Sequence, residues 1–323
     1  MSGMELENRL RCAALKDRLM SADEAAALIT DGMTVAVSGF TPAGCPKAVP
    51  LALAEQVRSG QRKLRLTLLS GASTGEELDS AWAECGIIAR RAPYMTSRPL
   101  RAAVNGGAAE EIAYTDLHLG EFAQNARYGF FGRIDVALIE AAAITADGSL
   151  IPTTALGCSQ TWIDLADKVI VEINLRQSAA LEGFHDVYRL ADPPRREPIP
   201  LTAPGQRIGR PYLSCPREKI AAVVVSECEE KPRPFPPADA VSEAIAHNIV
   251  RFLLREKEQG RLSADRVPLQ SGVGAVANAV LIGLKDSPLE HLSFYSEVMQ
   301  DGILDLIDAG KADFASATSL SLS

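Results

Sequence analysis

The chain has 323 residues, of which 47% are hydrophobic, and it carries a formal net charge of −8. A chain of this length and apolar content can bury enough surface for two domains. The negative charge repels phosphates, which argues against nucleic acid or anionic membranes as partners, and no apolar run approaches the roughly 20 residues of a membrane span.

The six cysteines are scattered along the chain, without a C-x-x-C pair and without histidines at metal-ligand spacing. This pattern is typical of reduced thiols in a cytoplasmic protein and gives no support to a metal site. The N-terminus has early glutamates and lacks an apolar core, so we expect no targeting peptide. Cys45, in a loop rich in glycine and proline, is the one thiol that we expect to be accessible.

Helical and strand-like patterns alternate along most of the chain, which predicts an α/β fold with largely parallel sheets. Ser21 and Glu24 form a capping box that begins a helix, and Gly32 is expected to end it. A buried strand follows at 34–37 and runs into the loop Gly39–Pro46. Further strands are predicted at 64–71, 134–144, 167–174 and 220–227.

A charged, proline-rich stretch, CEEKPRPFPP, lies about two thirds of the way along the chain. We interpret residues 229–237 as a linker between an N-terminal domain, 1–228, and a second domain, 238–323. The second domain is predicted to begin with a helix at 239–259 and to continue as β-α-β-α-β. Because the sequence stops on a strand-like run without a further helix, we expect this second domain to be incomplete.

Ligands of parallel α/β sheets gather beyond the carboxyl ends of the strands, and the turn Ser271–Val276 follows such an end. Gly272 and Gly274 permit positive φ angles and close approach of a ligand. The backbone N–H groups of Val273–Val276 face outward at a helix start, where they can hold an anionic oxygen. A plain tight turn between strand and helix would have the same sequence.

Glu297 ends the strand-like run LSFYSE, just before a turn expected at 300–302. If this strand and the one before the glycine turn are neighbours, their backbones lie about 4.8 Å apart and both features face one crevice. A glutamate that is ionised at neutral pH can act there as a carboxylate nucleophile. An ordinary solvated glutamate at a strand end is the alternative.

The same residues also fit a different chemistry. GVGAVA matches the dinucleotide-binding pattern G-x-G-x-x-[G/A], and Glu297 ends the next strand, where the ribose-binding acid is expected. The spacing from Gly272 to Glu297 is slightly long for that role. The motif by itself leaves a nucleotide-binding oxidoreductase open.

The stretches PLQSGVGAVANAVLIGL and YSEVMQDG together resemble the acetyl-CoA hydrolase/transferase family, within it the succinyl-CoA:acetate CoA-transferases. Other stretches resemble the family in the expected order: DGMTVAVSGFTPAGCPKAVP, RRAPYMTSRPLRAAVNGG, YTDLHLGEF, DKVIVEIN, HDVY, RIGRPYL and FASATSLSLS. The resemblance covers nearly the whole chain and implies two CoA-transferase-type domains. The resemblance also implies a portion beyond the last stretch, present in family members, that supplies further CoA contacts and oxyanion-hole donors.

The resemblance implies that Glu297 is the catalytic nucleophile of a family I CoA-transferase. It attacks an acyl-CoA to form an acyl-glutamyl anhydride, which the CoA thiolate converts to a glutamyl-CoA thioester before a second carboxylate takes the CoA. Succinate and acetate are the implied carboxylates. The CoA-contacting loop falls on Gly272, Val273, Gly274, Ala275 and Val276, with Ala275 where relatives often have asparagine.

The resemblance further implies that coenzyme A is substrate and product with no permanently bound cofactor, and that the enzyme is a cytoplasmic homodimer of acetate metabolism. The loop Gly39–Gly44 resembles a stretch that borders the family's active site. Acetyl-CoA hydrolysis is an alternative, since it differs only in whether water reaches the glutamyl intermediate. The alternatives of another class are an NAD-binding oxidoreductase and an inactive fragment that binds a partner chain through its unfinished sheet.

Overall fold

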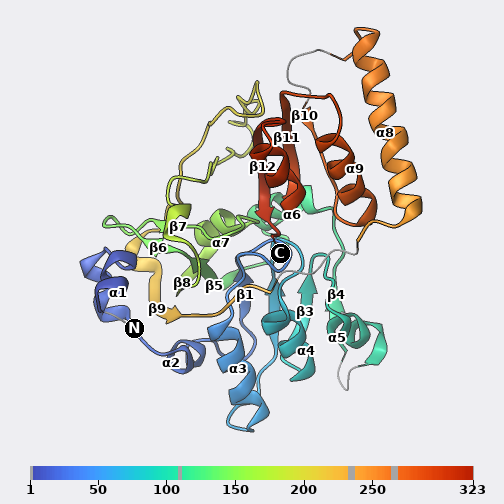
Figure 1. Cartoon of the computed structure of the whole chain (residues 1–323). Helices are drawn as coiled ribbons and strands as arrows, with labels where there is room; N and C mark the ends of the chain where they lie inside the picture. Colours follow the sequence, from blue (N-terminus) through green and yellow to red (C-terminus); the bar gives the residue numbers. More distant parts are fainter. Residues whose placement is uncertain (1–2, 108–110, 232–236, 263–267, 323) are drawn as a thin grey trace. The chain divides into compact units, whose positions relative to one another are not determined.

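The computed structural model describes residues 3–107, 111–231, 237–262 and 268–322 (Figure 1). The chain divides into two compact units: unit 1 comprises 1–189 and 209–231, and unit 2 comprises 190–208 and 232–323. The last passage between the units falls within the segment 229–237, of which 232–236 lie outside the described residues. Residues 190–208 fall within the predicted N-terminal domain, 1–228, but in the structure they interrupt unit 1 and belong to unit 2.

Unit 1 is built on a seven-stranded sheet in the order β4-β3-β2-β1-β5-β8-β9, in which all neighbouring strands are parallel. The strands are β1 (Thr34–Val37), β2 (Leu66–Leu69), β3 (Ile88–Ala92), β4 (Ala113–Tyr114), β5 (Ile134–Ala141), β8 (Ala166–Asn174) and β9 (Ile220–Ser226). The predicted strands and the parallel α/β fold are confirmed. The run 134–144 is divided, because Ala143–Ile144 (β6) leaves the sheet and pairs antiparallel with Leu150–Ile151 (β7).

Helices accompany both faces of this sheet (Figure 1). They are α1 (Gly3–Arg9), α2 (Ala22–Ala27), α3 (Ala48–Arg58), α4 (Ala81–Glu84), α5 (Arg98–Ala102), α6 (Leu119–Arg127) and α7 (Ser159–Leu165). The capping box of Ser21 and Glu24 begins α2 as predicted, with both reciprocal hydrogen bonds present. The helix ends earlier than predicted, at Ala27, and Gly32 with its φ of +78° lies in the turn before β1.

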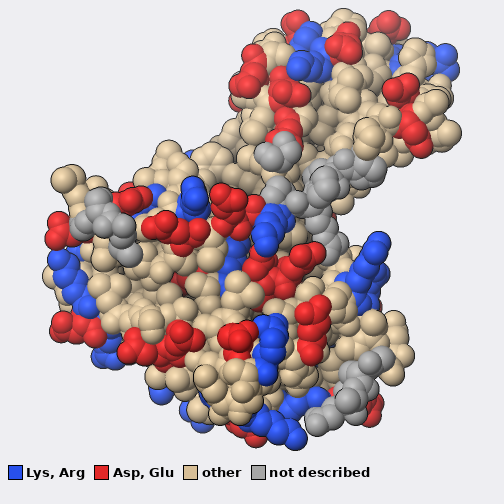
Figure 2. Space-filling model, turned by 60° about the horizontal axis from the view of Figure 1, so that its bottom comes forward, with Lys and Arg blue, Asp and Glu red and all other residues tan. Residues whose placement is uncertain are grey.

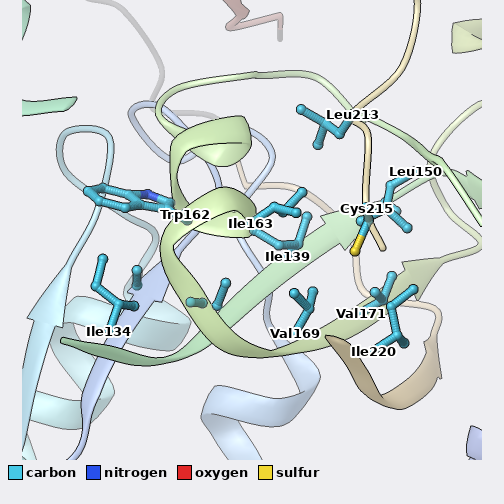
Figure 3. Close-up of a cluster of buried hydrophobic side chains, with 14 of the residues drawn as sticks. Ile134, Ile139, Leu150, Trp162, Ile163, Val169, Val171, Leu213, Cys215 and Ile220 are labelled. Atoms are coloured by element: carbon cyan, nitrogen blue, oxygen red, sulfur yellow. The ribbon is translucent and has the colours of Figure 1, made fainter. Parts of the chain in front are cut away.

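Two hydrophobic cores arise because successive residues of a strand point to opposite faces of the sheet. Val169 and Val171 of β8 contribute to one core, together with Trp162 of α7, whereas Ile170 contributes to the other. Figure 3 shows the first core, in which the Trp162 ring and Ile163 of α7 lie over the strands. Strands buried on both faces explain the near-continuous apolar runs in the sequence.

The strand order places the topological switch point of the sheet between β1 and β5. The chain proceeds from β1 outward to β4, and then returns to β5 on the other side of β1. The loop that follows β1 is anchored there by the buried Lys47, whose Nζ donates to Glu140 Oε2 and to the Cys45 carbonyl oxygen, both at 2.7 Å. Glu140 also accepts hydrogen bonds from Thr153 and Asn174.

A second buried carboxylate, Glu172 of β8, caps the start of α3. It accepts hydrogen bonds from the backbone N–H groups of Lys47, Ala48 and Val49 at 2.9 to 3.2 Å. A negative group at this position also interacts favourably with the positive end of the helix dipole. The two carboxylates therefore hold both the end of the loop and the beginning of the helix.

Burial governs the ionisation of these groups. It raises the pKa of Glu140 to about 7, although the neighbouring Lys47 ammonium acts in the opposite direction. The expectation of an accessible Cys45 is wrong: this thiol is 1% exposed, and burial raises its pKa well above the ordinary range. The reason is the tight loop, which folds back over Cys45 while Lys47 holds its carbonyl group.

Three glycines bring separate loops together at this edge of the sheet. A Cβ atom on Gly157 would lie 2.3 Å from the Gly39 carbonyl oxygen, and one on Gly71 would lie 2.6 Å from the same atom. Such distances are well below van der Waals contact, so the backbones approach closely only because side chains are missing.

We expect Gly157→Ala to destabilise unit 1 more than the control Gly60→Ala. Both glycines have positive φ angles, so each alanine adds backbone strain of about 1–2 kcal/mol. Only Gly157 adds a clash with backbone, worth roughly 1–3 kcal/mol more, because nothing lies within 4 Å of a Cβ on Gly60. Urea unfolding of the two variants measures the difference, and equal losses would contradict the close packing.

We expect Lys47→Met to lower the free energy of unfolding by about 3–5 kcal/mol, because it leaves Glu140 buried without its cation. The double variant Lys47→Met/Glu140→Gln should be more stable than that single variant. The glutamine amide removes the uncompensated charge and still accepts from Thr153. Urea unfolding of the single and double variants tests this, and additive losses would show that the two side chains do not interact.

Unit 2 contains a smaller sheet in the order β10-β11-β12, again entirely parallel. Its elements are α8 (Ala240–Glu258), β10 (Pro268–Leu269), α9 (Ala275–Lys285), β11 (Leu292–Met299), α10 (Asp301–Asp308) and β12 (Ala312–Leu320). The predicted β-α-β-α-β order and the leading helix are confirmed. The turn expected at 300–302 is instead the beginning of α10, with Gln300 as its N-cap residue.

Within the described part of the chain, no helix has both the length and the apolar character needed to cross a membrane. On the face of the molecule that Figure 2 shows, lysine and arginine side chains are interspersed with aspartate and glutamate. The charge on this face is therefore mixed in sign.

Candidate active site

The glycine turn follows β10, and β10 is the parallel neighbour of β11, which carries Glu297; this is the condition under which the sequence predicted one shared crevice. Pro268 pairs with Ser293 and Leu269 with Phe294. The turn begins directly after β10, and Glu297 belongs to β11. If the same register is continued past β10, Gly272 falls level with Glu297.

Glu297 lies within the last part of β11 and not at its tip, because the strand continues to Met299. Its neighbours alternate as expected of a strand that covers a core on one face. Tyr295 and Glu297 are exposed, whereas Phe294 and Val298 are buried. The carboxylate is therefore presented to solvent by a strand whose other face is fixed in the core of unit 2.

The glycine turn places backbone donors at the start of α9. Gly274 is the N-cap residue, with φ +121° and ψ −178°, a conformation that is essentially restricted to glycine. Only Gly274 of the two glycines has a positive φ, so the expectation of two such positions holds for one. Asn278 N–H donates to the Gly274 carbonyl oxygen, which leaves the N–H groups of residues 275–277 ahead of the helical ladder.

The turn is exposed and apolar in its side chains. Val273 is 56% exposed and Val276 is 40% exposed, and the N-cap residue, Gly274, has no side chain with which to cap the helix. Backbone N–H groups and the positive end of the α9 dipole are thus the features that favour an anionic oxygen here. Ala275 adds no polar group to them.

Two side chains of the β11 end connect it to the turn. Ser296 Oγ accepts a hydrogen bond from Ser271 N–H at 3.3 Å and donates one to the Ser271 carbonyl oxygen at 2.8 Å. Gln300 Nε2 donates to the Gly272 carbonyl oxygen at 2.6 Å. Neither residue was predicted from the sequence to belong to the site; their positions immediately before and three residues after Glu297 were the only signal.

The next feature to consider is metal binding. Among the residues with described positions, no group of three or more His, Cys, Asp or Glu side chains is arranged to hold a metal ion. A carboxylate near backbone donors is chemically capable of nucleophilic attack, with the start of α9 stabilising negative charge.

Comparison with known proteins identifies the family to which the chain belongs. A family model described as the acetyl-CoA hydrolase/transferase N-terminal domain matches residues 4–224. The chain belongs to the acetyl-CoA hydrolase/transferase family. The resemblance seen in the sequence is thereby confirmed.

Curated relatives extend the match into unit 2. The chain is 48% identical over 315 residues to the succinyl-CoA:acetate CoA-transferase of Clostridium kluyveri. It is 39% identical over 326 residues to the acetyl-CoA hydrolase of Saccharomyces cerevisiae. Both alignments cover 98% of this chain, but only 58% and 61% of the respective relatives.

Solved structures support the fold. RipA from Yersinia pestis superposes with a TM-score of 0.65 at 18% identity, and covers 98% of this chain and 65% of its own. The 4-hydroxybutyrate CoA-transferase from Porphyromonas gingivalis gives a TM-score of 0.61 at 16% identity, over 96% of this chain and 64% of its own. The α/β architecture of the chain is therefore that of CoA-transferase-like folds.

We expect Gly274→Ala to disturb the turn, whereas the neighbouring control Gly272→Ala should not. The conformation of Gly274 costs an alanine about 1–3 kcal/mol, while Gly272 lacks a positive φ and a Cβ there would meet nothing within 4 Å. Thermal unfolding and hydrogen exchange of the 270–278 region measure both effects. Equal behaviour of the two variants would contradict the described turn.

Proposed function

We propose that this chain carries the nucleophile and the glycine turn of a CoA-transferase that moves CoA between an acyl-CoA and a free carboxylate. The observation that carries the proposal is the parallel pairing of β10 with β11. Continued three residues past β10, this register brings Glu297 level with Gly272 in a donor-rich turn. Similarity to a succinyl-CoA:acetate CoA-transferase supports succinyl-CoA with acetate, or acetyl-CoA with succinate, as substrates.

The proposed reaction begins with attack of the Glu297 carboxylate on the thioester carbonyl carbon. The C–S bond breaks, CoA leaves as thiolate, and the acyl group remains on Glu297 as an anhydride. The thiolate then attacks the glutamyl carbonyl carbon, and the donor acid leaves as its carboxylate. Glu297 is now a glutamyl-CoA thioester, so the free energy of the thioester is retained.

The acceptor carboxylate reverses this sequence. It attacks the glutamyl-CoA carbonyl carbon and expels the thiolate, which attacks the new acyl carbonyl group and releases Glu297 as a carboxylate. Negative charge develops on a carbonyl oxygen in each step. The N–H groups at the start of α9 are suited to stabilise it, and coenzyme A serves as substrate and product without a resident cofactor.

Hydrolysis of acetyl-CoA is the second candidate, and two observations favour it. Relatives such as the Saccharomyces cerevisiae protein are acetyl-CoA hydrolases, and Glu297 is exposed in this structure. Water that reaches the glutamyl intermediate would give hydrolysis in place of transfer. A homodimer and a cytoplasmic location stay predictions that rest on the resemblance.

We expect incubation with acetyl-CoA followed by borohydride to reduce Glu297 to an alcohol, because borohydride traps the glutamyl-CoA thioester. Peptide mapping by mass spectrometry locates the modification. Glu297→Gln should abolish it, whereas Glu290→Gln, an exposed glutamate elsewhere in unit 2, should leave it unchanged.

The products of the reaction distinguish CoA transfer from acetyl-CoA hydrolysis. Formation of succinyl-CoA when succinate is added supports transfer, and release of free CoA without an acceptor supports hydrolysis. An unmodified Glu297 in a folded chain, together with tight NAD binding, would overturn both in favour of the dinucleotide site.

A further inference from the structure

The hydrogen bonds that flank Glu297 have a geometric consequence for the turn. The backbone ladder between β10 and β11 is recorded for Pro268 with Ser293 and Leu269 with Phe294. Two residues further on, the same register would pair Ser271 with Ser296. At that position the Ser296 hydroxyl forms both bonds to the Ser271 backbone, one as acceptor and one as donor.

Ser296 therefore extends the register of the strands two residues beyond the end of β10. One residue further along the same register, Gly272 falls level with Glu297. Because Ser296 immediately precedes Glu297 in β11, the bonds to Ser271 fix the distance between the nucleophile strand and the first residue of the turn.

Gln300 acts on the next peptide group. Its Nε2 donates to the Gly272 carbonyl oxygen at 2.6 Å, and its side chain is buried, with 1% of the residue exposed. In a planar trans peptide the carbonyl group and the following N–H point in opposite directions. With the Gly272 carbonyl held toward Gln300, the N–H of Val273 points away from the buried interior.

The burial of the Gln300 side chain costs folding free energy, because only one end of its amide is hydrogen-bonded within the described part of the chain. Gln300 Oε1 is buried and has no hydrogen-bond partner among the described residues. A buried acceptor without a partner destabilises the folded state, so an apolar side chain of the same length would suit the core better. Among the described residues, the hydrogen bond that the amide does form is the one from Nε2 to the Gly272 carbonyl oxygen.

We propose that Ser296 and Gln300 are positioning residues that hold the acyl-CoA-binding turn in register with Glu297. The inference rests on the proposed function. Ser296 sets the spacing between the turn and the nucleophile strand, and Gln300 sets the orientation of the Gly272–Val273 peptide group. Neither side chain reacts with the thioester.

The loss of either residue should affect the reaction more than the binding. The N–H groups at the start of α9 still bind the acyl-CoA, but the thioester carbonyl group is no longer held at a fixed distance from Glu297. A displacement of about 1 Å lowers the rate of a positioned reaction by about 100-fold. The concentration of acyl-CoA at half saturation should change little.

The experiment measures the rate of borohydride-trapped modification at Glu297 as a function of acetyl-CoA concentration. Gln300→Met and Ser296→Ala are expected to lower the maximum rate about 10- to 100-fold, with less change in the half-saturating concentration. Ser296→Thr keeps the hydroxyl group and should restore most of the rate. Ser293→Ala is the matched control: this buried serine of β11 has no hydrogen-bond partner among the described residues.

A second measurement does not depend on the reaction. Hydrogen exchange of the 270–277 region should be faster in Gln300→Met and Ser296→Ala, and unchanged in Ser293→Ala. The unfolding midpoint of Gln300→Met should stay near that of the wild type, since the unpartnered Oε1 is removed together with the bond to Gly272.

The two measurements separate the two proposals. A wild-type chain in which Glu297 is not modified overturns the proposed function, whereas the exchange data still test how the turn is held. Unchanged exchange and unchanged rates in both variants overturn the positioning role. A rate loss in Gln300→Met that is accompanied by a large fall in its unfolding midpoint also overturns it, since stability would then explain the loss.

Discussion

The parallel register of β10 on β11 is the constraint on which the proposed site depends. Parallel strands need a crossover connection, so the carboxyl ends of both strands lie at one edge of the sheet. The same connection begins with the glycine turn and α9. A strand pair in the opposite sense would place the turn and Glu297 at opposite ends of the sheet. The proposed chemistry therefore depends on the direction of the strands.

In unit 1, too, polar groups gather at the edge of the sheet where the carboxyl ends of parallel strands meet, but there they stabilise the fold. At the switch point between β1 and β5, buried charged groups are satisfied by one another and by backbone groups, as in the pair of Lys47 and Glu140. Such a network is costly unless every member is paired, and it fixes the loop after β1 in one conformation. Buried polar groups are thus concentrated at the edge of the sheet where the loops meet.

The carboxyl-end edges of the two sheets differ in how their carboxylates are surrounded. The buried carboxylates of unit 1 accept several hydrogen bonds each, as Glu140 does from Lys47, Thr153 and Asn174. In unit 2 the carboxylate of Glu297 is exposed, and the N–H groups at the start of α9 lie ahead of the helical ladder. The first arrangement stabilises the fold, whereas the second presents a carboxylate and helix-start N–H groups that could meet a ligand.

The sequence by itself determined the parallel α/β fold, the order of elements in unit 2 and the choice of Glu297 with the glycine turn, because periodicity, turn residues and family motifs are local signals. Tertiary structure decided the rest. Segment 190–208 joins unit 2, and Ser296 and Gln300 form hydrogen bonds to the turn, through contacts between residues distant in the chain. Cys45 is buried by the way its own loop folds, which the loop's composition did not reveal. Side-chain hydrogen bonds across 25 or 28 positions leave no periodic trace, so only the folded chain reveals them.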